Sequence, residues 1–232
     1  GFAIVDVVCG AWRSDAVRFN EHLGLGAIDV LCEAGFHVFA LRPGSTPQFT
    51  AGEMVVHVGA GVRYVLQRAK EFGVEPERYG LLGASAGGHI AALAALTPLG
   101  EMPRPAAVGL FFPPTDFLNY GGKPFDFHRS VDLPVDRLLF REGISEIAGE
   151  VSTEAAALHS PARNVVLDPP PTYLLHGDAD KVVPLQQSER LKEALEAAGG
   201  EVALRIKPGG GHPWKDIEPD IQAMTAWFLE AL

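Results

Sequence analysis

The chain is poor in cysteine, in long apolar runs and in basic clusters. Its 232 residues include only two cysteines, Cys9 and Cys32, which are too few for a disulfide framework and are interpreted as small buried thiols. No apolar run approaches the length of a membrane span. Acidic residues outnumber basic ones by 29 to 19, for a formal net charge of −10, and no basic block offsets this excess. These absences argue against a nucleic-acid partner and a membrane partner.

The first residue of the chain and its amino-acid composition predict where the protein is found and how many domains it has. No signal peptide is visible, and the chain begins with Gly1 rather than Met. We therefore expect a soluble protein with a processed or trimmed start, either cytoplasmic or secreted with its signal removed. Hydrophobic residues make up 47% of the chain and charged residues 21%, as in an ordinary globular protein. The length predicts one domain spanning residues 1–232.

Strand-like and helix-like stretches alternate along most of the chain. This alternation predicts an α/β fold with a mostly parallel sheet flanked by helices. The expected strands cover residues 3–8, 36–41, 80–82, 107–112, 173–175 and 202–206. The expected helices cover residues 28–34, 52–72, 89–96, 185–198 and 217–232.

Residues 113–171 interrupt this alternation. The segment is rich in proline and glycine, and only residues 135–141 and 153–159 form short helical patches. A long insertion in a compact domain is usually functional, so we expect a cap or lid that forms one wall of the substrate pocket. A disordered loop is the alternative, but four aromatic residues need something to cover: Phe117, Tyr120, Phe125 and Phe127.

The most informative stretch is Gly83-Ala84-Ser85-Ala86-Gly87, which lies between a predicted strand and a predicted helix. A Gly-x-Ser-x-Gly sequence in that context is typical of a nucleophile elbow, a sharp turn that needs small residues around the serine. The positive end of the following helix would favour the negative charge that develops during acyl transfer. We therefore predict that Ser85 is a nucleophile; the alternative is a packed serine in a turn.

A serine nucleophile needs a base, and the base needs an orienting group. His212 lies in a glycine-rich loop after a predicted strand, and Asp178 and Asp180 follow another one. The carboxyl ends of parallel strands meet at one edge of the sheet, where Ser85 also lies. Either aspartate is a candidate acid, and a metal site formed by His176, Asp178, Asp180 and His212 is the remote alternative. We expect His89 and His176 to be structural.

Three motifs resemble those of the α/β-hydrolases, and within them the compact acetyl- and feruloyl-esterase-like relatives of the prolyl oligopeptidase superfamily. They are Gly83-Ala-Ser-Ala-Gly-Gly-His89, His176-Gly-Asp-Ala-Asp180 with Val183-Pro184, and Gly209-Gly-Gly-His212. By this resemblance Ser85 is the nucleophile, His212 the base and Asp180 the acid, because the family spacing Gly-x-x-Asp favours Asp180 over Asp178. The resemblance covers nearly the whole chain and implies an α/β-hydrolase fold without a cofactor.

One motif departs from the family pattern. Such esterases usually carry His-Gly-Gly-Gly-Trp after an early strand, whereas this chain has Val8-Cys9-Gly10-Ala11-Trp12. The resemblance still implies oxyanion-hole amides from Gly10 and Ala11, beside that of Ala86. We also expect pocket contacts from aromatic residues near the site: Trp12, Trp214, Phe117 and Phe125. For the two tryptophans, packing in the core is the alternative.

These residues together predict a serine hydrolase that cleaves small-molecule carboxylic esters through an acyl-enzyme intermediate. A peptidase or amide hydrolase using the same residues is the nearest alternative, because the triad does not separate ester from amide cleavage. A non-catalytic binding protein on a hydrolase scaffold is a further alternative, although such a protein is expected to lack one triad residue.

Overall fold

A computed structural model describes residues 1–127, 137–140 and 149–232. Six parallel strands form one sheet in the order β2-β1-β3-β4-β5-β6. This order places β1 beside β3 and reverses the direction of winding there, so the crevice at their carboxyl ends is the expected ligand site of an open α/β sheet. The strands are β1 (Ala3–Val7), β2 (His37–Leu41), β3 (Tyr79–Ala84), β4 (Ala107–Phe111), β5 (Thr172–Gly177) and β6 (Val202–Lys207).

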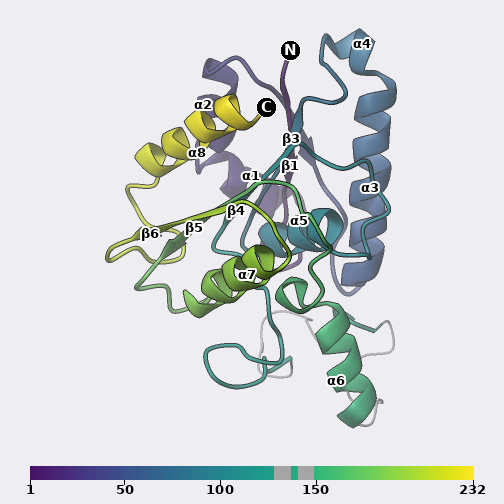
Figure 1. The fold of residues 1–232 in the computed structure, drawn as a ribbon, viewed down its shortest axis with the longest axis vertical. Helices are drawn as coiled ribbons and strands as arrows, with labels where there is room; N and C mark the ends of the chain where they lie inside the picture. The colour runs from purple at the N-terminus through teal and green to yellow at the C-terminus, as the bar shows by residue number, and fades with distance from the viewer. Residues whose placement is uncertain (128–136, 141–148) are drawn as a thin grey trace.

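Helices cover both faces of the sheet (Figure 1). One face carries α3 (Ala51–Gln67), α5 (Ala86–Leu96) and α7 (Gln186–Ala197), and the other carries α2 (Ala27–Glu33) and α8 (Glu218–Ala231). The remaining helices are α1 (Ala16–Leu23), α4 (Ala69–Phe72), α6 (Gly149–Leu158) and the 3₁₀ helix η3 (Pro161–Arg163). These layers confirm the expected fold class, a mostly parallel sheet flanked by helices.

Alternating side chains divide the strands between two apolar cores. Val5 and Val7 of β1 pack into the core beneath α3 and α5, whereas Ile4 packs into the core beneath α2 and α8. Leu81 and Leu82 of β3 divide in the same way. Both faces of a parallel sheet are buried, so its strands are nearly continuous apolar runs. Asp6, also fully buried on β1, is the exception and is discussed below.

Several helix boundaries differ from the predictions. The helix expected over 52–72 divides at Arg68 into α3 and α4, and α3 begins with a capping box in which Thr50 and Glu53 bond each other's backbone N–H. The sequence analysis missed α1 entirely. Asp15 caps α1 by accepting from the Arg18 N–H, but α1 is only eight residues long and none of its residues is buried.

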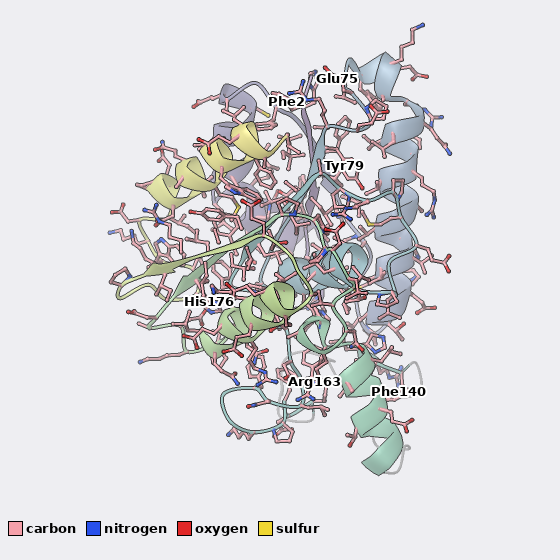
Figure 2. The ribbon with its side chains drawn as sticks, viewed as in Figure 1. Phe2, Glu75, Tyr79, Phe140, Arg163 and His176 are labelled. Atoms are coloured by element: carbon pink, nitrogen blue, oxygen red, sulfur yellow. The ribbon has the colours of Figure 1, made fainter. Side chains whose placement is uncertain are left out.

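The insertion between β4 and β5 extends from the carboxyl edge of the sheet (Figure 1). Helix α6 covers most of the patch expected at 153–159. Of the patch expected at 135–141, residues 137–140 are described and form no α-helix, and residues 135, 136 and 141 lie outside the described residues. Figure 2 shows Arg163 where the insertion returns to the domain, His176 beside α7, and Tyr79 nearer the end of the sheet that carries the amino terminus.

The two cysteines differ in their exposure to solvent. Both cysteines are free, but only Cys9 is buried; Cys32 is exposed on α2, so the prediction of two buried thiols was wrong for Cys32. The preceding residue of α2, Leu31, is the one that is buried.

Within the described ranges, no helix combines the length and apolar character that crossing a bilayer requires.

Candidate active site

Ser85 occupies the sharp turn between β3 and α5. Its backbone has a φ of 53° and a ψ of −123°, a combination that costs strain for a residue with a side chain. A Cβ at Gly83 would lie 2.5 Å from the Gly87 carbonyl oxygen, and a Cβ at Gly87 would lie 2.2 Å from that of Val7. Glycine is therefore required on both sides, and the elbow predicted from the sequence is present.

A continuous hydrogen-bonded row joins Ser85, His212 and Asp180. Ser85 Oγ lies 2.8 Å from His212 Nε2, and His212 Nδ1 lies 2.7 Å from Asp180 Oδ2. The three residues follow β3, β6 and β5, and they meet at the carboxyl edge of the sheet. This geometry suits proton transfer from a serine hydroxyl to an imidazole that a carboxylate orients.

Asp180 is strongly favoured as a carboxylate. Its side chain is fully buried, which by itself opposes ionisation, but hydrogen bonds to its oxygens hold its pKa well below the ordinary value. The bonds come from His212 and from the backbone N–H groups of Val182 and Val183 at 2.8 and 2.9 Å, and His176 Nε2 lies 3.5 Å from Oδ2. The carboxylate is thus ready to stabilise positive charge on His212.

The loop that carries His212 is fixed on both sides. The Phe112 ring packs on the imidazole with ring centroids 4.4 Å apart, and Trp214 packs on the far side of Phe112. Trp214 Nε1 donates to the buried Asp220 at 3.0 Å, and Asp220 also pairs with Lys207 at the end of β6. Because Asp220 holds the chain before and after His212, it restricts where the imidazole can lie.

A tight turn at Gly10–Arg13 follows β1 and faces Ser85 across the cavity. The Gly10 N–H donates to the Arg13 carbonyl at 2.9 Å, and the Arg13 N–H donates back at 3.0 Å. Ala11 and Trp12 both adopt positive φ, 49° and 55°, as the centre of a type I′ turn requires. The expectation that Gly10 supplies an oxyanion-hole amide was wrong, because that N–H is already bonded.

The remaining candidate donors are the amides of Ala11 and Ala86. Among the described residues, neither N–H has a hydrogen-bond partner. Ala86 begins α5, where the first-turn amides and the helix dipole favour an anion. Ala11 and Ala86 both line the cavity that contains Ser85.

His89 supports the turn from the interior. Trp12 Nε1 donates to His89 Nδ1 at 3.0 Å, so the other ring nitrogen, Nε2, carries the proton and donates to the His159 carbonyl at 2.8 Å. Burial lowers the pKa of His89 to about 3, which keeps the ring neutral. His89 therefore connects the turn after β1 to the end of α6, and neither of its ring nitrogens bonds Ser85.

Ser85 and His212 line a cavity of about 660 Å³, whereas the buried Asp180 does not reach it. Its walls include Trp12 and Phe125, with Pro114 and Tyr120 from the same insertion as Phe125. The described start of the insertion thus lies at the site.

Two expected pocket residues do not line this cavity. Phe117 is only 1% exposed and lies behind Phe125, against Trp12 and His89. Trp214 lies behind Phe112 and bonds Asp220. Both predictions were wrong because the aromatic residues form a layered cluster, and only its outer layer reaches the cavity.

Helix α1 supplies the wall that the sequence analysis missed. Arg18, Glu21 and His22 all line the cavity. Arg18 and Glu21 form a partly exposed ion pair at 2.6 Å, and His22 bonds the buried Asp6 at 2.6 Å. The available signals were Asp15 as a helix cap and Asp6 as an acid inside an apolar strand.

Other reactive groups near the site have structural partners. Burial raises the pKa of the Cys9 thiol to about 12, so this cavity-lining sulfur remains protonated. His176 bonds Ser188 Oγ at 2.7 Å and the Val183 carbonyl at 2.8 Å. The part of the chain that the structure describes contains no group of three or more His, Cys, Asp or Glu side chains placed to hold a metal.

A family model and several relatives match this chain. The BD-FAE model matches residues 2–195, a stretch that includes Ser85 and Asp180. The chain belongs to the BD-FAE family. The expected resemblance to the α/β-hydrolase serine esterases is thereby confirmed.

Two curated relatives of this BD-FAE member are named as esterases. The isoprenylcysteine alpha-carbonyl methylesterase ICME of Arabidopsis thaliana is 28% identical over 217 residues, which cover 90% of this chain and 49% of the relative. The probable carboxylic ester hydrolase LipM of Mycobacterium tuberculosis is 28% identical over 192 residues, which cover 80% of this chain and 43% of the relative. The chain spans about half the length of the curated relatives it matches.

Solved structures agree with the fold. A truncated form of a carbohydrate esterase from gut microbiota is similar with a TM-score of 0.82 and 28% identity, covering 99% of this chain and 85% of that one. Esterase Est2 of Thermogutta terrifontis, solved with butyrate, has a TM-score of 0.70 and 24% identity, covering 99% and 82%. The second likeness concerns the fold alone.

Proposed function

We propose that this BD-FAE family member hydrolyses small-molecule carboxylic esters through an acyl-enzyme intermediate on Ser85. The observation that carries the proposal is the row from Ser85 Oγ through His212 to Asp180, with distances of 2.8 and 2.7 Å. The esterase names of its relatives support the reaction class.

In the first half-reaction, Ser85 Oγ attacks the ester carbonyl carbon while His212 Nε2 takes its proton. The buried Asp180 carboxylate stabilises the imidazolium that forms. The amides of Ala86 and Ala11 are assigned to the oxyanion, where losing one donor typically costs about 10²–10³-fold in rate. The imidazolium then gives its proton to the leaving alcohol as the C–O bond breaks.

In the second half-reaction, water replaces the alcohol. His212 takes a proton from the water as its oxygen attacks the acyl carbon, and the same proton returns to Ser85 Oγ when the acid leaves. Every proton transfer in this scheme uses His212 Nε2. The scheme requires no cofactor.

An activity-based probe tests the proposal. A fluorophosphonate should add one phosphonyl group to the wild-type chain, detected by intact mass, and should not label Ser85→Ala. Turnover of p-nitrophenyl esters should be abolished in Ser85→Ala and in His212→Ala. Since the two residues act as a unit, the double variant should be little slower than either single variant. Substantial hydrolysis by Ser85→Ala would refute the assignment.

A substrate panel separates ester from amide cleavage. We expect p-nitrophenyl esters of increasing acyl length to be cleaved, and aminoacyl p-nitroanilides to be cleaved far more slowly. Faster cleavage of the anilides would favour a peptidase or amide hydrolase on the same residues. A folded protein that neither reacts with the probe nor cleaves either panel would instead be a binding protein on a hydrolase scaffold.

A further inference from the structure

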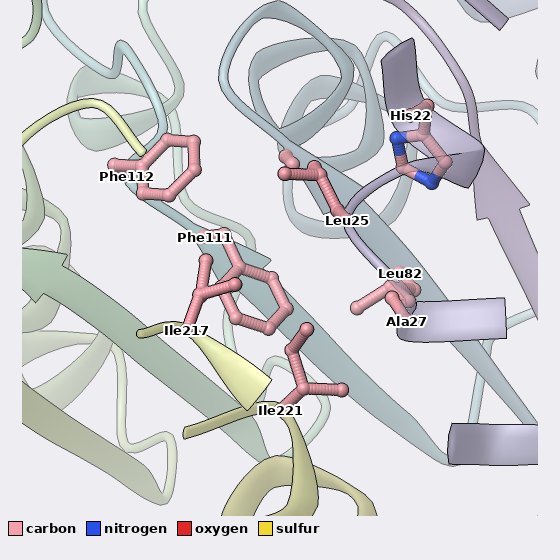
Figure 3. Close-up of a pocket in the computed structure, with 9 residues that line it drawn as sticks. His22, Leu25, Ala27, Leu82, Phe111, Phe112, Ile217 and Ile221 are labelled. Carbon is pink, nitrogen blue, oxygen red and sulfur yellow. The ribbon is translucent and has the colours of Figure 1, made fainter. Parts of the chain in front are cut away.

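A second aspartate–histidine pair lies beside the cavity. Asp6 on β1 is fully buried, and its Oδ2 lies 2.6 Å from Nε2 of His22 in the last turn of α1. His22 lines the same cavity as Ser85 and Ala84. It also edges a small apolar pocket beneath that cavity, with Phe112 across from it (Figure 3). The proposed reaction makes no use of this pair.

Stability does not explain why an acid occupies this strand position. Its neighbours Val5 and Val7 are fully buried, and Asp6 pairs in register with the apolar Leu82. Asp6 Oδ1 is the one buried side-chain nitrogen or oxygen among the described residues that has no hydrogen-bond partner. Burying such an atom is unfavourable, so an apolar side chain would stabilise the strand better. A role at the cavity is the remaining explanation.

The surroundings of His22 favour its charged form. Burial opposes protonation, but the charge of Asp6 and its hydrogen bond raise the pKa of His22 above the ordinary value. The carboxyl end of α1 also favours a cation. The other charged groups on this wall are Arg18 and Glu21, which pair with each other, and His212 lies on the same cavity. The wall is therefore balanced in charge.

The second ring nitrogen of His22 is open. Within the described residues, Nδ1 has no hydrogen-bond partner, and it is not among the enclosed unpartnered atoms. Nδ1 is therefore an exposed atom on a side chain that lines the cavity. In the imidazolium form this nitrogen carries a proton and needs an acceptor, whereas in the neutral form bonded to Asp6 it can only accept.

We propose that His22, held by Asp6, donates a hydrogen bond from Nδ1 to a neutral ether or hydroxyl oxygen of the substrate, beyond the scissile ester group. A neutral oxygen fits because the two ion pairs leave this wall without excess charge. His22 is then a specificity-determining residue. This inference rests on the proposed ester hydrolysis at Ser85.

Pairs of esters that differ in one atom test the inference. In each pair an ether oxygen replaces one methylene: p-nitrophenyl methoxyacetate against butanoate, 3-methoxypropanoate against pentanoate, and 4-methoxybutanoate against hexanoate. On the alcohol side, 2-methoxyethyl acetate is compared with butyl acetate. The measured quantity is the ratio of kcat/KM within a pair, from which the contribution of His212 cancels. The intrinsic reactivity of each ester cancels when variants are compared with the wild type.

Three variants separate the contribution of the Asp6 charge from that of the His22 ring to this ratio. Asp6→Asn keeps a hydrogen-bond acceptor for Nε2 but removes the charge that favours the imidazolium, so it should lower the ratio about tenfold for the pair that reaches His22. His22→Phe should lower it similarly. Because His22→Phe leaves a buried carboxylate unpaired, the double variant Asp6→Leu/His22→Phe removes both halves and protects the fold. His37→Phe, an exposed histidine on β2, is the matched control and should keep the wild-type ratio.

The pH dependence gives an independent measurement. The ether preference of the wild type should persist while His22 is protonated and decline as the pH rises through its raised pKa. An unchanged ratio in Asp6→Asn and in the double variant would overturn the inference while leaving the hydrolase intact. A wild-type preference that is independent of pH would also overturn it. A wild-type chain that cleaves no ester and does not label at Ser85 would refute the proposed function, and this inference with it.

Discussion

Asp178 Oδ1 accepts a hydrogen bond from the Gly209 N–H at 2.6 Å, so the aspartate that does not reach His212 holds the loop on which His212 stands. The neighbouring Asp180 instead bonds the imidazole directly. Two acids two residues apart in the sequence thus have different partners. This difference can be measured.

Substitution of the two acids should have unequal effects. Asp180→Ala should lower kcat/KM about 10³–10⁴-fold, because His212 loses both its orientation and its compensating charge. Asp178→Ala removes one hydrogen bond at an exposed position and should cost less than about tenfold. Both are measured with p-nitrophenyl butanoate, with circular dichroism as the check of folding. Equal losses would mean that loop position matters as much as the acid itself.

The corrected positions of two phenylalanines give a second prediction. Phe125→Ala removes part of the cavity wall and should change the preference between short and long acyl esters by about 1–3 kcal/mol. Phe117→Ala empties a buried site and should lower the free energy of unfolding by about 3–5 kcal/mol, with little change in acyl preference. Denaturant unfolding and kcat/KM across the ester series separate the two effects. A stable Phe117→Ala variant with altered preference would contradict this division.

The start of the insertion depends on a buried acid. The fully buried Asp116 accepts from Arg163 Nε at 2.7 Å and from Arg190 Nε at 2.8 Å, joining the start of the insertion to its later part at η3 and to α7. Burial opposes ionisation of Asp116, but the hydrogen bond and charge of Arg163, the charge of Arg190 and the Leu118 N–H hold its pKa below the ordinary value.

Asp116→Asn should therefore destabilise the fold in a pH-dependent way. The contribution of Asp116 is fully present above its unfolded pKa, about 3.9, and is lost as the pH falls through its lower folded pKa. We expect Asp116→Asn to lower the free energy of unfolding by about 2 kcal/mol at pH 7, and the deficit to shrink in acid. Asp168→Asn is the control, because Asp168 is 87% exposed and its pair with Arg104 should contribute almost nothing. A deficit that is independent of pH would contradict the role of the charge.

The turn that faces Ser85 should be strained. Ala11 has a φ of 49°, a conformation that is unfavourable for a residue with a Cβ. Ala11→Gly should raise the free energy of unfolding by about 0.5–1 kcal/mol, because relief of strain exceeds the entropy that glycine loses. Ala60→Gly, in the exposed middle of α3, should instead lower it by about 0.5–1 kcal/mol. Urea unfolding measures both, and a destabilised Ala11→Gly variant would mean that the turn is relaxed with alanine.

The sequence predicted the residues that follow strands better than those that line walls. Ser85, Asp180 and His212 each follow a recognisable strand, and parallel strands bring their carboxyl ends to one edge. The roles of these residues remain predictions, but their proximity could be predicted from their order in the chain and from the position of each one after a strand. The inner layer of the aromatic cluster could not be predicted in this way, because the sequence does not indicate whether Phe117 or Phe125 faces the cavity.

The errors at the turn and on α1 have separate causes. Gly10 was expected to supply an amide, but the closure of its turn on Arg13 depends on backbone angles that alanine rarely adopts. Helix α1 escaped detection because it is only eight residues long, and its polar residues Arg18, Glu21 and His22 line a cavity. A helix this short gives too few turns for its periodicity to be recognised in the sequence.

The insertion lies between β4 and β5 and contains none of Ser85, Asp180 and His212. Its described start nevertheless contributes Pro114, Tyr120 and Phe125 to the cavity wall. This stretch of polypeptide therefore carries part of the cavity wall but none of the three residues to which the reaction is assigned. An engineer could replace this stretch with that of another BD-FAE protein, keeping Asp116 as the joint, and obtain a new substrate range on an unaltered nucleophile.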